Sequence, residues 1–195
     1  MSKNVTIISS LTMATPDGPF TVVADDDDVI ASGWTSDHDF VLHWHLLMRG
    51  SVVVCDASHV TPLLQQAADA VTAYYDGDDR PARQVPVWQQ STPFQARARD
   101  ALVAVPYGKC ISYADLASAA GSPKGARAAA AVCANNHTAL FVPCHRVIRG
   151  DGSLGGFLYG LAIKQQLLDR ETRQACGLAQ PPTSRTGRPT PHNRG

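Results

Sequence analysis

Charge is divided unevenly along the chain, and this division predicts two separately organised regions. Residues 1–90 hold 4 basic residues against 12 Asp, a net charge of −8, whereas residues 91–195 hold 13 basic residues against 5 acids, a net charge of +8. A total of zero would ordinarily argue against a nucleic-acid partner, because phosphate binding needs a local excess of Lys and Arg. Here the net charge of zero results from two opposite charges that cancel, so the second half retains the positive charge that phosphate binding requires.

The first half has the pattern of a small α/β domain. Apolar runs on both sides of residues 16–19 and of Asp25–Asp28 predict short antiparallel strands joined by acidic turns. The four Asp residues could form a metal site, but consecutive turn residues splay apart, which favours a solvated hairpin tip. Residues 62–75 show helical spacing, and residues 76–87 have the composition of a linker. We predict an acidic N-terminal domain at residues 1–90, with a small antiparallel sheet and a helix.

The second half reads as a mainly helical domain at residues 91–176, with short strands. Thr92 and Pro93 are typical of a helix start, and that helix should run to about residue 103. A short helix at residues 113–120, a turn at Gly121 and a second helix from Ser122 to about residue 134 form a helix-turn-helix pattern. A packed structural hairpin is the alternative interpretation. The tail at residues 177–195 is expected to be disordered. The whole fold is therefore predicted as α/β, of the α+β type.

Several classes of protein are excluded by the same pattern. No run approaches the roughly 20 apolar residues that a membrane helix needs, so we expect no membrane partner and a cytoplasmic location. The five cysteines show no Cys-x-x-Cys pair, which argues against a disulfide framework or a zinc knuckle. His43 and His45 lack a third ligand and are interpreted as packed or surface side chains. The glycine loop at residues 150–156 matches GxGxxG but does not open a helix, so no dinucleotide cofactor is predicted.

Cys144 is the best candidate for a nucleophile. It lies beside His145 and Arg146 in an apolar stretch, and positive neighbours lower the pKa of a thiol from about 8.5. Glu171 is the only Glu in the chain, and helical spacing places it on the same face as Lys164. A buried carboxylate needs a partner, and His145 is the natural one, because a carboxylate orients an imidazole and raises its basicity. An exposed Glu171 near basic neighbours is the alternative.

These residues occur in an order that resembles the O6-alkylguanine-DNA alkyltransferase family, also called the methylated-DNA–protein-cysteine methyltransferases. The resemblance is strong over residues 92–171 and loose before them. The segments that carry it are Ile111-Ser112-Tyr113, Ser122-Pro123-Lys124-x-Ala126-Arg127-Ala128, Asn136, Pro143-Cys144-His145-Arg146-Val147-Ile148, and Gly155-Gly156-Phe157-x-x-Gly160-Leu161-x-x-Lys164-x-x-Leu167-Leu168-x-x-Glu171.

The resemblance implies DNA repair by direct reversal, in which the protein acts once. An alkyl group would move from O6-alkylguanine, and from O4-alkylthymine, in duplex DNA to Cys144. His145 would deprotonate the thiol through a water while Glu171 orients it. Tyr113 would rotate a phosphate and protonate the leaving base, and Asn136 would brace the active-site turn.

The resemblance also implies how DNA is held. Arg127 would fill the gap left by a flipped nucleotide in the minor groove, with further DNA contacts from Tyr113, Ser122, Ala126 and Gly150. The base pocket would be formed by Val147, Gly155, Gly156, Phe157 and Leu158. The implied partner is double-stranded DNA carrying O6-alkylguanine. The protein would be a monomer that could cluster on DNA, and it would need no cofactor.

Three positions depart from the family pattern. His137 stands where Pro is usual, Phe157 replaces a common Tyr, and Leu158 replaces a small polar residue of some members. The N-terminal half has no Cys/His set that matches the zinc site of the family, so no metal is predicted. The sequence bears on three other classes of protein. Cys144 argues against a binding-only relative, which would carry Trp at this position, and the five cysteines are too scattered for the four-cysteine zinc domain of a self-methylating transcriptional regulator. A cysteine hydrolase would differ by turning over its substrate.

Overall fold

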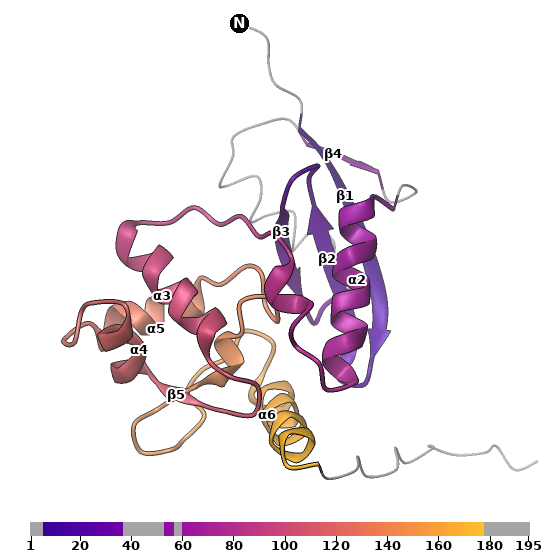
Figure 1. Ribbon diagram of the computed structural model, residues 1–195. Coiled ribbons are helices and arrows are strands. Elements are labelled where there is room, and N and C mark those ends of the chain that lie inside the picture. The colour runs from indigo at the N-terminus through magenta and orange to yellow at the C-terminus, as the bar shows by residue number, and fades with distance from the viewer. Residues whose placement is uncertain (1–5, 37–52, 57–59, 178–195) are drawn as a thin grey trace, which may run out of the picture.

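Figure 1 shows the computed structural model, in which a four-stranded sheet with one helix across its face lies beside a group of helices formed by the second half. The structure describes residues 6–36, 53–56 and 60–177. The predictions for His43, for His45 and for disorder after residue 177 lie outside these residues. None of the helices described is long and apolar enough to cross a membrane.

The sheet confirms the predicted antiparallel strands and adds one that is parallel. Strands β1 (Thr6–Thr15), β2 (Gly18–Ala24) and β3 (Val29–Gly33) pair antiparallel, whereas β4 (Val53–Asp56) pairs parallel with β1, in the order β3-β2-β1-β4. The β2–β3 turn is the predicted acidic one. The Asp25 carboxylate accepts hydrogen bonds from the N–H groups of Asp27 at 3.1 Å and Asp28 at 2.8 Å, which is how Asp stabilises a turn.

Helix α2 (Pro62–Tyr75) packs against the sheet, as its apolar spacing predicts. The Thr61 hydroxyl accepts a hydrogen bond from the N–H of Leu64 at 3.2 Å, and Pro62 occupies the first helical position, where its missing N–H costs nothing. The core between helix and sheet also contains Phe141 and Leu167 from the second half. The two halves of the chain therefore share one hydrophobic core.

The second half contains helices α3 (Pro93–Ala104), α4 (Tyr113–Ala119), α5 (Ala126–Ala134) and α6 (Leu161–Ala175). Strands β5 (Ile111–Ser112) and β6 (Val147–Ile148) pair with each other as a two-stranded parallel sheet. Helix α3 begins as predicted, with a reciprocal capping box between Thr92 and Gln95.

The predicted start of the second helix of the pair at Ser122 is wrong, because residues 122–125 form a turn. The N–H of Gly125 donates to the Ser122 carbonyl at 2.8 Å, and a Cβ at Gly125 would lie 2.7 Å from the Ser122 hydroxyl oxygen. Helix α5 therefore begins only at Ala126. Helices α4 and α5 pack against each other, and their use as a DNA-reading helix-turn-helix stays a prediction.

The segment at residues 76–87 is not a linker. It contains a short 3-10 helix, η1 (Ala82–Gln84), and the side chains of Ala82 and Val85 belong to the shared core. Asp79 is buried because Arg83 at 2.7 Å and Arg146 at 2.9 Å pair with its carboxylate. The composition resembles that of a linker because one of the two partners of Asp79, Arg146, lies 67 residues away in the sequence. A domain boundary at residue 90 stays a prediction.

Candidate functional site

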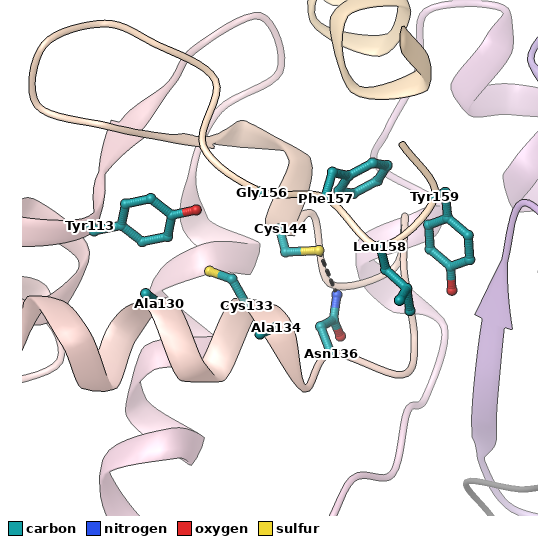
Figure 2. A pocket seen from close by; sticks show the side chains of 10 residues that line it. All are labelled: Tyr113, Ala130, Cys133, Ala134, Asn136, Cys144, Gly156, Phe157, Leu158 and Tyr159. Atoms are coloured by element: carbon teal, nitrogen blue, oxygen red, sulfur yellow. Dashed lines mark hydrogen bonds between the residues drawn. The ribbon is translucent and has the colours of Figure 1, made fainter. Parts of the chain in front are cut away.

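Cys144 lies in a cavity of about 330 Å³ in the second half of the chain (Figure 2). Helices α4 and α5 form one side of this cavity, and the loop before α6 forms the other. The residues that line it are Tyr113, Ala130, Cys133, Ala134, Asn136, Cys144, Gly156, Phe157, Leu158 and Tyr159. Most of them are apolar, so the cavity suits a ligand with a largely apolar surface, and the Cys144 sulfur lies in its wall.

The sulfur is held by the turn that follows α5. Cys144 begins a single 3-10 turn, η2 (Cys144–Arg146), and its Sγ accepts a hydrogen bond from Asn136 Nδ2 at 3.1 Å, drawn in Figure 2. The same Nδ2 donates to the Val142 carbonyl at 2.7 Å, and Asn136 Oδ1 accepts from Gln89 Nε2 at 3.0 Å. Asn136 thus ties the active-site turn to the sulfur and is itself held from a third segment.

The expectation that adjacent positive charges lower the pKa of Cys144 is wrong. Burial raises the pKa of this thiol, and the hydrogen bond from Asn136 and the charge of Lys164 offset that effect only in part. The side chains next to Cys144 in the sequence point elsewhere: His145 pairs with Glu171, and Arg146 pairs with Glu171 and Asp79. In this state the sulfur is a protected thiol that needs a base.

His145 and Glu171 form the predicted pair. His145 Nε2 and Glu171 Oε1 are 2.7 Å apart, and both residues are fully buried. Burial alone would raise the pKa of Glu171, but His145 and Arg146 outweigh it and lower the pKa to about 2. The alternative of an exposed Glu171 is therefore wrong. His145 Nδ1, the other ring nitrogen, is buried and has no hydrogen-bond partner among the described residues.

Two further side chains complete the Glu171 site, and sequence reasoning assigned neither of them to it. The Tyr74 hydroxyl donates to Glu171 Oε1 at 2.9 Å, and Arg146 donates to both carboxylate oxygens at distances of 2.9 to 3.2 Å. The N–H of Gly108 adds a hydrogen bond at 3.1 Å. Tyr74 is 97 residues from Glu171 in the sequence, so no local pattern could connect them.

Lys164 holds the loop over the cavity. Its ammonium group is fully buried and donates to the backbone carbonyls of Val147 at 2.6 Å, Leu154 at 2.5 Å and Gly156 at 3.4 Å. Burial lowers the pKa of Lys164. Spacing along α6 identified this residue as inward-facing, but its three carbonyl partners were not predictable.

Tyr113 and Cys144 both line the cavity, as the predicted roles require. Burial, followed by the neighbouring Cys133 and Cys144, raises the pKa of Tyr113, so its phenol keeps its proton at neutral pH. A Cβ at Gly155 would lie 2.8 Å from the Tyr113 hydroxyl oxygen, and Gly155 has a φ of +67°. Glycine is therefore required at this position on two counts.

The other predicted residues differ in exposure and in their place in the fold. Arg127 is exposed in the first turn of α5, Gly150 is exposed, and Ser122 and Ala126 are half-buried. Gly156, Phe157 and Leu158 line the cavity. The side chain of Val147 instead packs in a separate apolar cluster with Leu102 and Leu116.

Sequence reasoning missed Cys133 and Tyr159 in the lining. Cys133 follows Ala130 by three positions on α5, so helical spacing could have placed both on the cavity face. Among the described residues, no group of three or more His, Cys, Asp or Glu is arranged to hold a metal ion.

This fold and this site define a class of protein: one that carries a buried cysteine in an apolar cavity next to a pair of helices. A family model described as "6-O-methylguanine DNA methyltransferase, DNA binding domain" matches residues 93–173. The chain is 37% identical over 146 residues to the constitutive methylated-DNA–protein-cysteine methyltransferase of Bacillus subtilis, covering 75% of this chain and 84% of that relative. The chain belongs to the methylated-DNA–protein-cysteine methyltransferase family, whose members are DNA-repair enzymes.

Two further likenesses agree with this membership. The chain is 43% identical over 109 residues to the bifunctional transcriptional activator and DNA repair enzyme Ada of Escherichia coli. The match spans 56% of this chain but only 30% of that protein. Its structure is similar to that of Mycobacterium tuberculosis OGT in complex with DNA, with a TM-score of 0.67 and 27% identity, covering 86% of this chain and 94% of that one.

Proposed function

We propose that the protein repairs alkylated DNA by transferring the alkyl group of O6-alkylguanine in duplex DNA to Cys144. The observation that carries this proposal is the position of the Cys144 sulfur in an apolar cavity, hydrogen-bonded to Asn136 and beside a buried His145–Glu171 pair. O4-alkylthymine presents the same kind of alkyl–oxygen bond and is included in the proposed substrate class. The protein acts as a monomer in the cytoplasm.

The chemistry follows from the arrangement of these groups. His145 Nδ1 takes the thiol proton through a bridging water, since this nitrogen has no hydrogen-bond partner among the residues that the structure describes and Glu171 holds the opposite nitrogen. The thiolate sulfur then attacks the alkyl carbon, so that a C–S bond forms as the C–O bond breaks. The Tyr113 hydroxyl supplies a proton to the departing guanine. The product is a thioether that nothing in the site can hydrolyse, so each molecule acts once.

The damaged base must leave the helix to reach the sulfur. Arg127 projects from the start of α5 and would take the place of the flipped nucleotide, while small residues let α5 approach the minor groove closely. Extrusion costs a few kcal/mol and costs least for a weakly paired base, which favours alkylated guanine.

Intact-mass measurement after incubation with a duplex that contains O6-methylguanine tests the proposal. The mass should rise by one methyl group per protein molecule, and the Cys144→Ala variant should show no increase while still binding DNA. Cys133→Ala is the matched control, because it removes the other thiol that lines the cavity and should keep the increase. Many turnovers per molecule would indicate a hydrolase, and a methylated Cys144→Ala variant would identify a different acceptor.

A further inference from the structure

A second cavity, of about 280 Å³, shares no lining residue with the cavity above Cys144. It is lined by Gln90, Ser91 and Thr92 before α3, by Arg99 on α3, and by Asn135 and His137 after α5. These residues supply a guanidinium group, an imidazole, hydroxyls and amides. No carboxylate lines the cavity.

Arg99 is the unusual residue of this cavity. It is only 9% exposed, and no ion pair with it is present in the described part of the chain. Its Nη1 donates to the carbonyls of Gln89 at 3.4 Å and Gln90 at 3.3 Å and to the Ser91 hydroxyl, whereas its Nε is buried with no hydrogen-bond partner. Burial lowers the pKa of Arg99, and no carboxylate among the described residues offsets this shift.

A buried guanidinium group without a counter-charge destabilises the protein that holds it. Tethering the loop at residues 89–91 explains the bonds of Nη1, but a neutral amide could make such bonds and would leave no charge unpaired. A bound anion would neutralise that charge. The same cavity opens at the start of α3, where the helix dipole favours negative charge.

We infer that this cavity binds an oxyanion of the phosphate class, held by Arg99 and by the hydroxyl and amide groups at the start of α3. His137 adds a polar ring to the opposite wall. Burial and the charge of Arg99 lower the pKa of His137 to about 4, so its ring is neutral at pH 7 and can serve as a hydrogen-bond donor. The phosphate group could belong to the DNA backbone or to a free anion.

Titration of the ¹⁵N-labelled full chain with inorganic phosphate tests the inference, in Tris–chloride buffer at pH 7 with the ionic strength held constant. We expect saturable chemical-shift changes confined to the amides of Ser91, Gln95, Arg99, Asn135 and His137. Arg99→Gln should weaken phosphate binding about tenfold or more, since a charge-assisted bond is lost. Arg97→Gln is the matched control: Arg97 lies on the same helix but donates to the Ala120 carbonyl, so this variant should bind as the wild type does.

The Asn135→Asp variant is a second test of phosphate binding, which applies even if Arg99→Gln does not fold. Asn135 is exposed at the cavity, and a carboxylate of the same shape there should compete with phosphate and weaken its binding. Shifts that do not saturate in the wild type would overturn the inference. Equal affinity in Asn135→Asp and the wild type would overturn it as well.

Binding of an unmodified duplex at several salt concentrations identifies the source of the phosphate. If the source is the DNA backbone, Arg99→Gln should weaken duplex binding and reduce the slope of log K against log salt by about 1. If the source is a free anion, the variant should lose phosphate binding and keep the duplex slope. Methylation of Cys144 is read separately by mass, so failure of the proposed repair activity would not be confused with failure of this site.

Discussion

At the scale of single residues, the reactivity of Cys144 depends on few neighbours. The sulfur is buried, and Asn136 Nδ2 at 3.1 Å donates the one side-chain hydrogen bond that it receives from the described residues. A hydrogen bond to a charged group contributes about 1.5 to 3 kcal/mol, or roughly a 10- to 100-fold effect on an equilibrium. Asn136→Ala should therefore raise the pKa of Cys144 and slow alkyl transfer at pH 7 by about that factor.

The rate of Cys144 alkylation as a function of pH measures this effect. Asn135→Ala is the control, because the exposed Asn135 side chain donates to the Ala131 carbonyl at 2.8 Å, with no bond to Cys144 in the described part of the chain, and should leave the profile unchanged. An Asn136→Ala profile that coincides with that of the wild type would show that the bond to sulfur has no effect on the thiolate.

His137 predicts a dependence of stability on pH. Its pKa falls from 6.5 to about 4 on folding, because burial and the charge of Arg99 disfavour the protonated ring. Between these values the unfolded chain binds a proton that the folded chain does not, so stability is complete above about pH 6.5 and falls as the pH drops towards 4. The contribution is at most about 3 kcal/mol.

Urea unfolding at several pH values between 4 and 7 measures this loss, and His137→Asn should flatten it. Glu171 contributes in a lower window: its pKa is lowered to about 2, so its contribution is complete above about pH 4.5 and is lost as the pH falls through 2. If His137→Asn retains the wild-type slope between pH 4 and 6.5, then His137 is not the group responsible.

At the scale of elements, the local signals of helix start and apolar spacing predicted α2 and α3 close to their observed bounds. The start of α5 was missed, because the turn before it depends on the contact between Ser122 and Gly125. Strand β4 pairs parallel with β1 across a long connection, which no local pattern encodes.

The residues of the candidate site also fall into two groups, those that the sequence predicted and those that it did not. Cys144, His145 and Glu171 stood out because rare, reactive residue types occurred at informative positions. Tyr74 and Asp79 did not, because each acts on a partner at least 67 residues away. Partners this distant become visible only when the fold brings them together.

Helix α5 carries a prediction about DNA. Arg127 is exposed and makes no hydrogen bond or ion pair with the described part of the chain, which suits a side chain that acts on a ligand. Arg127→Ala should slow repair of O6-methylguanine in duplex DNA by about tenfold or more, because extrusion of the base costs a few kcal/mol. Transfer from the free base O6-benzylguanine should change little.

Single-turnover rates on the two substrates measure this difference. Lys124→Ala is the matched control, since Lys124 is an exposed cation in the turn before α5, and its loss should weaken DNA binding without separating the two substrates. Equal losses of Arg127→Ala on duplex and free base would argue against a role in flipping.

At the scale of the whole molecule, the acidic half supplies partners to the basic half. Asp79 pairs with Arg146 at 2.9 Å, and Asp17 pairs with Arg170 at 2.5 Å. Tyr159 lines the Cys144 cavity and donates to the Ser32 carbonyl of β3 at 3.1 Å. The separation of charge along the sequence thus becomes attraction between two packed halves. The cavity around Cys144 lies in the second half, but both halves support it.

Asp78 and Asp79 are adjacent in the sequence but differ in burial, so substituting each one tests whether buried ion pairs between the two halves stabilise the protein. Asp79 is buried between Arg83 and Arg146, whereas the one ion pair of Asp78 with the described residues is to the exposed Arg80. Asp79→Asn should destabilise the protein by about 2 to 4 kcal/mol, since it removes a buried counter-charge. Asp78→Asn should change stability little, because solvent screens an exposed pair. The midpoint of urea unfolding measures both.

Alkyl transfer by the folded Asp79→Asn variant decides what the acidic half does for the site. Arg146 bridges Asp79 and Glu171, and Glu171 orients His145, so a displaced Arg146 should leave the imidazole less well held. We expect Asp79→Asn to slow transfer at a urea concentration and temperature where it is fully folded, and Tyr74→Phe, which removes the 2.9 Å bond to Glu171, to slow it as well. Loss of stability with an unchanged transfer rate in both variants would show that the acidic half supports the fold alone.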